Sequence, residues 1–263
     1  MTIEDLLAGR SVVVVAAHPD DESGSAGGLL QRLRDPVIVH ATDGSPRNLG
    51  DARAAGYERR EDYMLARRQE LLNALEIAGI GAERTRALDF VDQESSFHMR
   101  EAAERIAAIL KDIRPGAVLT HPYEGGHPDH DAAALAVHLA CASLPSPPEI
   151  FEFTSYHAAR PEEAAIELGL FLPGQDPGEV VVLPAGRRET KRRMLDCFVT
   201  QKRMLEQFPV DEERYRPAPA YDFTEAPHPG RLFYENFDWG ITGGEWRRLA
   251  GEALRSAGIK ATL

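Results

Sequence analysis

The sequence predicts an α/β fold, a Rossmann-like three-layer architecture with a mostly parallel central sheet. The first indication is that short β-branched apolar runs alternate with segments of helical periodicity along most of the 263 residues. The second is the run at 11–17, which is apolar on both faces, as a central strand covered by two helix layers should be. The third is a composition of 43% apolar and 27% charged residues, which suits a globular domain with a sizeable core.

The expected elements follow in chain order from periodicity and from turn residues. Strands are expected at 11–17, 37–42, 86–91, 117–120, 150–156 and 179–183. Helices are expected at 24–34, 63–78, 101–113, 129–143 and 189–208. Residues 45–62 carry a proline, two glycines and many charges, so a long loop is expected there, and long loops in compact domains are often functional.

The chain is expected to divide at residue 208. Residues 1–208 would form the Rossmann-like domain, and residues 209–263 would form a C-terminal extension rich in proline and aromatic residues. Aromatic residues at this density are unusual in disordered tails, so the extension is expected to pack on the domain or at an oligomer interface. Assembly into a homo-oligomer therefore stays open.

Charge and composition exclude several classes of partner. The net charge is −12 and the isoelectric point is about 5.3, so the surface repels nucleic-acid phosphates and anionic lipids. The N-terminus is acidic, unlike a signal peptide, and the apolar run at 12–17 is too short to span a bilayer. Cys141 and Cys197 are too few for a disulfide framework. We therefore expect a cytoplasmic protein with no nucleic-acid or membrane partner.

Two histidine–carboxylate clusters carry the chemistry. His18-Pro19-Asp20-Asp21-Glu22 follows the first strand, and His127-Pro128-Asp129-His130 precedes a helix-like segment. In open α/β sheets, ligands bind beyond the carboxyl ends of the strands, so these two loops are expected to meet. Two histidines and one carboxylate (His18, Asp21 and His130), with a position left for water, suit a catalytic zinc ion, Zn2+, or another divalent metal.

The remaining cluster residues supply acid–base groups. Asp20 lies beside Asp21 and is the candidate base that takes a proton from the attacking water. His127 is the candidate acid. Neighbouring carboxylates are expected to raise its pKa, so that the imidazolium stabilises the oxyanion and protonates the departing amine. Asp129 is placed to fix a histidine tautomer, and His121 suits this kind of supporting role or a structural one equally.

These segments have two simpler interpretations, a turn and a dinucleotide site. A lone His-Pro-Asp sequence is most often a turn, so the predicted metal site depends on finding both clusters at strand ends. Gly24, Gly27 and Gly28 also follow the first strand, which invites a dinucleotide site. Three carboxylates stand where the pyrophosphate would lie, so these glycines are expected to allow close packing of a helix on the sheet instead.

The motifs Ala17-His18-Pro19-Asp20-Asp21-Glu22 and Gly126-His127-Pro128-Asp129-His130 resemble the two signatures of the LmbE-like, or PIG-L, zinc-dependent deacetylases. These enzymes remove acetyl groups from N-acetylglucosamine units attached to various aglycones. The similarity extends over most of residues 10–216. It implies zinc on His18, Asp21 and His130, with Asp20 as base and His127 as the acid or oxyanion partner, in agreement with the assignment from the residues.

The resemblance also implies contacts with the substrate. It points to Arg67, in the segment Arg67-Arg68-Gln69-Glu70-Leu71, although a solvated helix residue is an equal alternative. It also points to Asp92, which stands where the family has a loop aspartate. Some members carry a tyrosine just before the Gly-His of the second motif. The nearest tyrosine here is Tyr123, which becomes a third candidate.

The predicted function is a zinc-dependent hydrolase that removes the N-acetyl group from an N-acetylglucosamine-type conjugate, a small amino-sugar substrate. One alternative is a metal-dependent hydrolase of another amide or ester, because the ligand set does not specify the acyl group. The other is a non-catalytic sugar-binding protein on the same fold. The presence of all five chemical residues argues against it: His18, Asp20, Asp21, His127 and His130. The sequence does not specify the aglycone.

Overall fold

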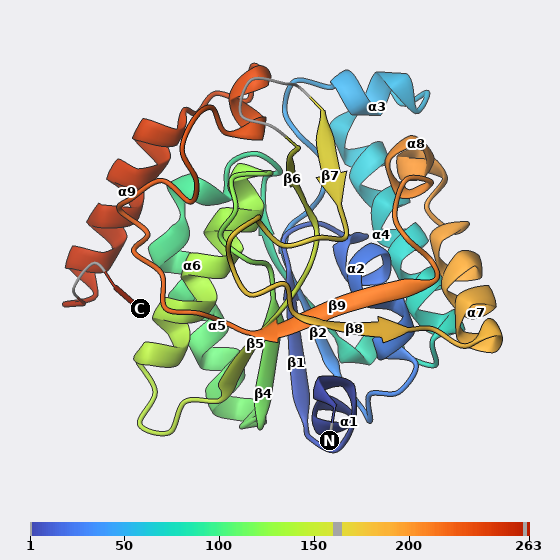
Figure 1. The fold of residues 1–263 in the computed structure, drawn as a ribbon. Helices are drawn as coiled ribbons and strands as arrows, with labels where there is room; N and C mark the ends of the chain where they lie inside the picture. Colours follow the sequence, from blue (N-terminus) through green and yellow to red (C-terminus); the bar gives the residue numbers. More distant parts are fainter. Residues whose placement is uncertain (1, 160–164, 260–261) are drawn as a thin grey trace.

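The computed structural model describes residues 2–159, 165–259 and 262–263, and its centre is a seven-stranded sheet of order β3-β2-β1-β4-β5-β9-β8 (Figure 1). The strands are Val12–Ala16 (β1), Val37–Thr42 (β2), Thr85–Phe90 (β3), Ala117–Thr120 (β4), Glu149–Phe153 (β5), Glu179–Val182 (β8) and Glu212–Pro217 (β9). The first five pair in parallel, and β9 pairs antiparallel with both β5 and β8. The predicted mostly parallel α/β sheet is confirmed.

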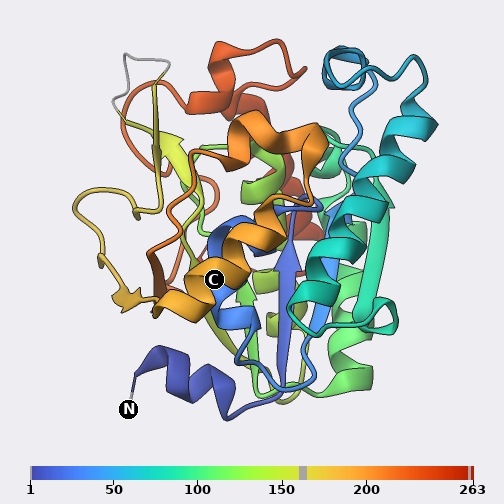
Figure 2. The same ribbon diagram turned by 90° about the vertical axis from the view of Figure 1, so that its right-hand side faces the viewer.

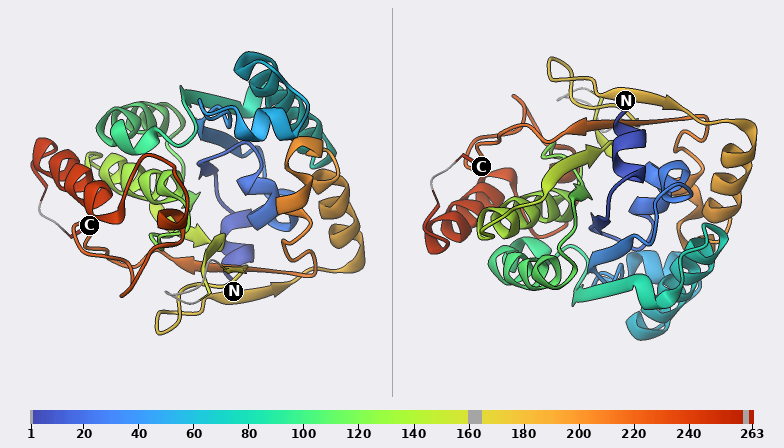
Figure 3. Two further views of the ribbon diagram at one scale, coloured as in Figure 1. Left: turned by 90° about the horizontal axis from the view of Figure 1, so that it is seen from above. Right: turned by 90° about the horizontal axis from the view of Figure 1, so that it is seen from below.

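Helices cover both faces of this sheet (Figures 2 and 3). One layer contains α5 (Met99–Ile113), α6 (Pro128–Ala142) and α9 (Gly243–Ser256), and the other contains α2 (Asp21–Leu30), α4 (Arg60–Ile77) and α7 (Ala185–Leu195). Successive side chains of a strand point to opposite faces, so Val13 and Val15 of β1 join the first core and Val12 and Val14 join the second. This explains why β1 is apolar at every position.

Shorter elements complete the fold. The short helices are Ile3–Ala8 (α1), Gly50–Ala54 (α3), Lys202–Leu205 (α8), Ala82–Arg84 (η1), Ser95–Phe97 (η2), Val199–Gln201 (η3) and Phe233–Asn236 (η4), and a small antiparallel sheet pairs Tyr156–Ala158 (β6) with Ile166–Leu168 (β7). The loop expected at 45–62 thus contains α3 and the start of α4. The long helix expected at 189–208 is divided into α7, η3 and α8. Among the described residues, no helix combines the length and apolar character needed to span a membrane.

The residues after 208 pack against the rest of the molecule. β9 lies inside the main sheet, and α9 packs on α5 and α6. Trp246 of α9 is fully buried, and its indole nitrogen donates to the carbonyl oxygen of Pro128 at 3.1 Å. Because Pro128 begins α6, the C-terminal helix supports the second histidine cluster directly. The division of the chain at residue 208 stays a prediction.

Candidate active site and metal centre

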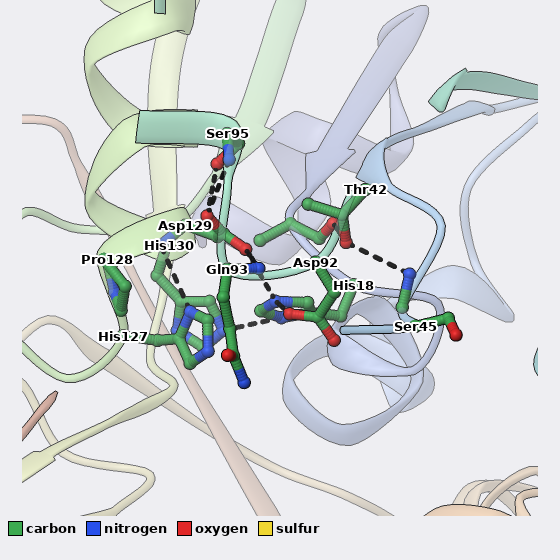
Figure 4. A network of polar contacts seen from close by, with 12 residues as sticks. His18, Thr42, Ser45, Asp92, Gln93, Ser95, His127, Pro128, Asp129 and His130 are labelled. Carbon is green, nitrogen blue, oxygen red and sulfur yellow. Dashed lines mark hydrogen bonds and ion pairs between the residues drawn. The ribbon is translucent and has the colours of Figure 1, made fainter. Parts of the chain in front are cut away.

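The two histidine clusters meet at the carboxyl edge of the sheet, the upper edge in Figure 1. His18 lies just beyond β1, and His127 is the N-cap of α6, the helix that follows β4. His18 and His130 are 112 residues apart in sequence, yet their ring centroids are 5.1 Å apart (Figure 4). The fold therefore brings the two predicted loops together.

Donor atoms of His18, Asp21 and His130 form a compact triangle. His130 Nε2 lies 3.2 Å from both His18 Nδ1 and Asp21 Oδ1, and His18 Nδ1 lies 3.3 Å from Asp21 Oδ2. All three residues are buried. In a tetrahedral zinc site with bonds of about 2.0–2.1 Å, neighbouring donors lie roughly 3.3 Å apart. The triangle therefore fits a divalent cation.

Other donors in this buried cluster already have hydrogen-bonding partners. Three further groups have donor atoms close enough to hold a metal ion: His18, His127 and His130; Asp21, His121 and His130; and His18, Asp92, His127 and Asp129. However, His121 Nε2 accepts the backbone N–H of Ala17 at 3.0 Å, and both oxygens of Asp129 accept hydrogen bonds. Asp21 Oδ2 likewise accepts the backbone N–H of His18 at 2.7 Å, so the choice of His18, Asp21 and His130 as ligands stays a prediction.

The second nitrogen of His18 faces carboxylates. His18 Nε2 lies 3.1 Å from Asp92 Oδ1 and 3.4 Å from Asp129 Oδ2. A proton on Nε2 directed at these oxygens leaves the lone pair of Nδ1 for a metal. Asp129 is itself held by the backbone N–H of Gln93 and by the N–H and hydroxyl of Ser95, at 2.6, 3.1 and 2.6 Å (Figure 4).

Asp20 is paired with Arg67 of α4. The guanidinium donates to Asp20 Oδ2 at 2.9 Å and to the carbonyl oxygen of Gly44 at 2.7 Å, and Arg67 is only 4% exposed. Burial raises the pKa of Asp20 to about 6, against the opposing attraction of Arg67. Gly44 has a φ of +65°, and a Cβ there would meet Arg67 Cζ at 2.9 Å, so this turn requires glycine. Arg67 is therefore a buried member of the site and not a solvated helix residue.

His127 is in a neutral form in this environment. Its Nδ1 accepts the backbone N–H of Asp129 at 3.1 Å, so the ring proton resides on Nε2. Burial, together with repulsion from His18 and His130, lowers the pKa of His127 well below its usual range. Asp92 and Asp21 do raise this pKa, as predicted, but burial and the two neighbouring histidines lower it more, so the expected net rise is wrong.

His121 supports the first cluster. It is fully buried, its ring stacks on that of His130 with centroids 4.1 Å apart, and its Nε2 lies 3.3 Å from Asp21 Oδ2. Burial lowers the pKa of His121 to about 3, so the ring is neutral and can accept the N–H of Ala17. This contact fixes the backbone immediately before His18.

A cavity of about 140 Å³ lies over the two clusters, and Arg67 and Asp92 are in its lining. Tyr123, the third candidate for substrate contact, is not among the described residues that line it. Its hydroxyl donates to the carbonyl oxygen of Glu225 at 2.8 Å, and its ring stacks on Trp246. The tyrosine that the structure places at the cavity is Tyr156, whose ring centroid lies 5.2 Å from that of His130.

Tyr156 and Trp239 were missed in the sequence. Tyr156 closes the strand predicted at 150–156, and a position at a strand end was the available signal. Trp239 lies in the aromatic extension, far from either motif, and its ring centroid is 4.6 Å from that of His127. Gly126 allows the second histidine loop to approach the backbone of Tyr156, because a Cβ there would lie 1.9 Å from the carbonyl oxygen of Tyr156.

Comparison with known proteins identifies the domain. Residues 13–141 match the family described as PIG-L: GlcNAc-PI de-N-acetylase, and this range contains both histidine clusters. Residues 13–141 therefore resemble a PIG-L family domain, as the two motifs predicted.

Two curated relatives are deacetylases. The chain is 35% identical over 140 residues to a probable N-acetyl-alpha-D-glucosaminyl L-malate deacetylase 2 of Bacillus cereus, covering 52% of this chain and 63% of that protein. It is 35% identical over 134 residues to the diacetylchitobiose deacetylase of Thermococcus kodakarensis, covering 48% and 47% respectively. The chain thus spans less than two thirds of the length of these relatives.

Solved structures show the same fold. The A40926 pseudoaglycone deacetylase superimposes with a TM-score of 0.60 at 22% identity, covering 79% of this chain and 96% of that one. The 4-carboxy-2-hydroxymuconate hydratase of Pseudomonas putida superimposes with a TM-score of 0.53 at 17% identity, covering 79% and 95%. At these identities the likeness concerns the fold alone, and the fold carries more than one kind of chemistry.

Proposed function

We propose that this protein is a zinc-dependent hydrolase that removes the acetyl group from an N-acetylglucosamine-type conjugate. The observation that carries the proposal is the triangle of His18, Asp21 and His130 donors, with Asp20 and His127 beside it in one cavity. The named activities of the curated relatives support the same reaction and substrate class.

The donor set suits zinc. Two imidazole nitrogens and one carboxylate oxygen match catalytic zinc sites, which keep a position open for water or substrate. When bound there, the cation would polarise the amide carbonyl and acidify the attacking water. Asp92 and Asp129 would orient His18 by accepting its Nε2 proton.

Asp20 is proposed as the general base. With a pKa of about 6, it is ionised at neutral pH and still basic enough to take a proton from water during attack on the amide. Arg67 binds Oδ2 of this carboxylate, which leaves Oδ1 as the oxygen proposed to accept the proton. Arg67 is thus a positioning residue for the base.

His127 is proposed as the hydrogen-bond donor to the developing oxyanion, a role that its neutral ring can fill without giving up a proton. The backbone N–H of Asp129 holds its Nδ1, so Nε2–H is the available donor. The proton that Asp20 removes from water is then delivered to the departing amine, so the imidazole of His127 stays neutral throughout. The sum is amide plus water to amine plus acetate.

The decisive experiment replaces Asp20 with asparagine. Asp20→Asn keeps the shape and a contact for Arg67 but removes the base, so acetate release should fall by about 100- to 10,000-fold while bound zinc stays at the wild-type ratio. Zinc content and acetate release from several N-acetylglucosamine conjugates are measured on the same preparations. A matched variant, His130→Gln, should lose both zinc and activity.

Three outcomes would contradict these assignments. An Asp20→Asn variant within tenfold of the wild-type rate would remove Asp20 from the base role. Loss of zinc in that variant would make Asp20 a ligand. A zinc-loaded wild-type protein that leaves every N-acetyl sugar intact but cleaves other amides or esters would overturn the substrate class.

A further inference from the structure

A row of four aromatic side chains, Tyr156, Phe233, Phe237 and Trp239, extends from the catalytic cavity. We call this row the aromatic wall. Ring centroids along it are separated by 5.8, 5.1 and 4.6 Å in that order. Its two ends reach the catalytic histidines, since Tyr156 lies 5.2 Å from His130 and Trp239 lies 4.6 Å from His127, centroid to centroid. Both ends of the aromatic wall therefore lie beside histidines of the site.

The wall is held in place by the loop that carries the second cluster. The backbone N–H of Phe233, in η4, donates to the carbonyl oxygen of Gly125 at 2.9 Å, two residues before His127. The carboxylate of Glu235 accepts the N–H groups of Leu232 and Gly243, which closes the η4 segment on itself. The rings are thus positioned before any ligand binds, which reduces the entropic cost of binding.

The wall lines a hollow that continues from the catalytic cavity. This groove has a volume of about 1030 Å³ and shares Tyr156, Gln201 and Trp239 with the lining of the cavity. The cavity alone, at about 140 Å³, is smaller than the roughly 300–1,000 Å³ of ordinary small-molecule sites. A conjugate whose acetamido group reaches the zinc ligands must therefore place its remainder in the groove.

The lining of the groove favours an uncharged ligand with an apolar ring. Phe237 is 42% exposed although it stacks on Trp239, and exposed aromatic surface beside a site is typical of ligand contact. The charged residues that line the groove balance: Lys202 and Arg203 are cationic, whereas Asp51 and Glu206 are anionic. Lys202 Nζ lies 3.5 Å from Glu206 Oε1, which further reduces any net field.

We propose that the aromatic wall is the aglycone subsite, and that the substrate presents an uncharged apolar ring to Phe237 and Trp239. This inference rests on the proposed function, because it places the acetamido sugar at the zinc ligands. All four wall residues lie outside the 13–141 segment that matches the family, three of them in 233–239. The proposed subsite is therefore built by residues beyond the matched segment.

The test compares two glycosides of N-acetylglucosamine, methyl and 4-nitrophenyl, in both anomeric forms, with the zinc-loaded full chain. The wild-type KM should be lower for the aryl glycoside. Phe237→Ala should raise that KM roughly 3- to 10-fold, with kcat unchanged and the methyl glycoside unaffected. The matched control is Phe97→Ala, the same truncation at a phenylalanine 47% exposed outside both hollows, and it should change neither KM.

Each other outcome has a defined meaning. Equal KM values for the two glycosides, or an unchanged aryl KM in Phe237→Ala, would overturn the subsite while leaving the deacetylase proposal intact. A Phe237 effect on N,N'-diacetylchitobiose but not on the aryl glycoside would replace the apolar ring with a second sugar. A dimer that dissociates in Phe237→Ala without a change in KM would make the wall a subunit interface and overturn the proposal.

Two further measurements keep the subsite testable. If no glycoside releases acetate, the proposed function fails, and calorimetric binding of the aryl and methyl glycosides to wild type and Phe237→Ala still decides the role of the wall. If Phe237→Ala does not fold, Phe237→Leu keeps the apolar volume but removes the aromatic face, and it should weaken aryl binding in the same direction.

Discussion

Asp129 links the backbone of Gln93 and Ser95 to the proposed ligand His18, so replacing it tests how this ligand is oriented. Its Oδ2 accepts the N–H of Gln93 and faces His18 Nε2, whereas its Oδ1 accepts the N–H and the hydroxyl of Ser95. Asp129→Asn can keep only one acceptor oxygen. In its better orientation the amide keeps both Ser95 contacts and turns its NH₂ towards the N–H of Gln93 and the ring of His18.

The expected loss can be worked out from this geometry. The variant loses one short hydrogen bond to a buried carboxylate, the 2.6 Å bond from Gln93, and bonds to charged groups contribute about 1.5–3 kcal/mol. The free energy of unfolding of the metal-free protein should therefore fall by about 2–3 kcal/mol. Zinc affinity should fall about 10- to 100-fold, because His18 loses one of the two carboxylates that orient it.

Asp131→Asn is the matched control, two residues further along the same helix. A single oxygen of Asp131, Oδ1, accepts both of its hydrogen bonds, from the N–H groups of Glu124 and Gly125 at 3.1 Å. The asparagine can keep both and removes a carboxylate whose pKa burial raises to about 7, so the free energy of unfolding should not fall at neutral pH. Urea unfolding and competition with a zinc chelator give the two quantities. Equal zinc affinity in wild type and Asp129→Asn, or equal losses in both variants, would refute the orienting role of Asp129.

Two further predictions concern stability. Burial lowers the pKa of His138 from 6.5 to about 4, so between these pH values only the unfolded chain binds the proton. The contribution of His138 to the free energy of unfolding should therefore decrease by up to about 3 kcal/mol as pH falls through this window. Urea unfolding of wild type and His138→Gln at several pH values measures it. A difference between the two proteins that does not change with pH would contradict the prediction. Gly126→Ala should lower the free energy of unfolding by about 1–3 kcal/mol and weaken zinc binding, because the new Cβ would lie 1.9 Å from the carbonyl oxygen of Tyr156. Gly186→Ala in α7 meets no atom within 4 Å and should be neutral or slightly stabilising, so equal effects of the two glycine changes would argue against the steric explanation.

The parallel part of the fold could be predicted from the sequence because its signals are local. β2 has the predicted bounds 37–42, and β4 the predicted bounds 117–120. Both strands are buried at every position, so their β-branched and apolar runs are uninterrupted. The helices predicted at 63–78 and 101–113 differ from α4 and α5 by up to three residues at their ends, because apolar periodicity locates a helix face and not its caps.

β9 could not be predicted, because two of its three buried side chains, Glu213 and Arg216, are charged. Glu213 accepts a hydrogen bond from Lys191 at 2.8 Å, and Arg216 pairs with Glu152 at 2.7 Å, with all four residues buried. These partners are distant in sequence, so no local pattern reveals that the charges are satisfied. A strand with the sequence Glu-Glu-Arg-Tyr-Arg-Pro therefore resembles a solvated loop until its neighbours are known.

Within the site, too, features with a local sequence signal could be predicted, and features that depend on distant segments could not. The positions of His18, Asp21 and His130 follow from two motifs at strand ends, and strand ends meet wherever the sheet is parallel. The ionisation state of His127 depends instead on how completely other segments cover it, and Trp239 lies more than a hundred residues away. A pKa set by burial cannot be obtained from neighbouring carboxylates in the sequence, which is why that prediction had the wrong sign.

The arrangement separates catalysis from recognition along the chain. The proposed ligands, base and oxyanion hydrogen-bond donor all lie within 13–141, whereas three of the four wall residues lie within 233–239. The link between the two is the contact of Phe233 with Gly125 and of Trp239 with His127. Substitutions at Phe237, which touches neither histidine cluster, can therefore change the preferred aglycone without disturbing the metal. Substitutions at Trp239 should alter both, because its ring also covers His127 and contributes to the burial that keeps this histidine neutral.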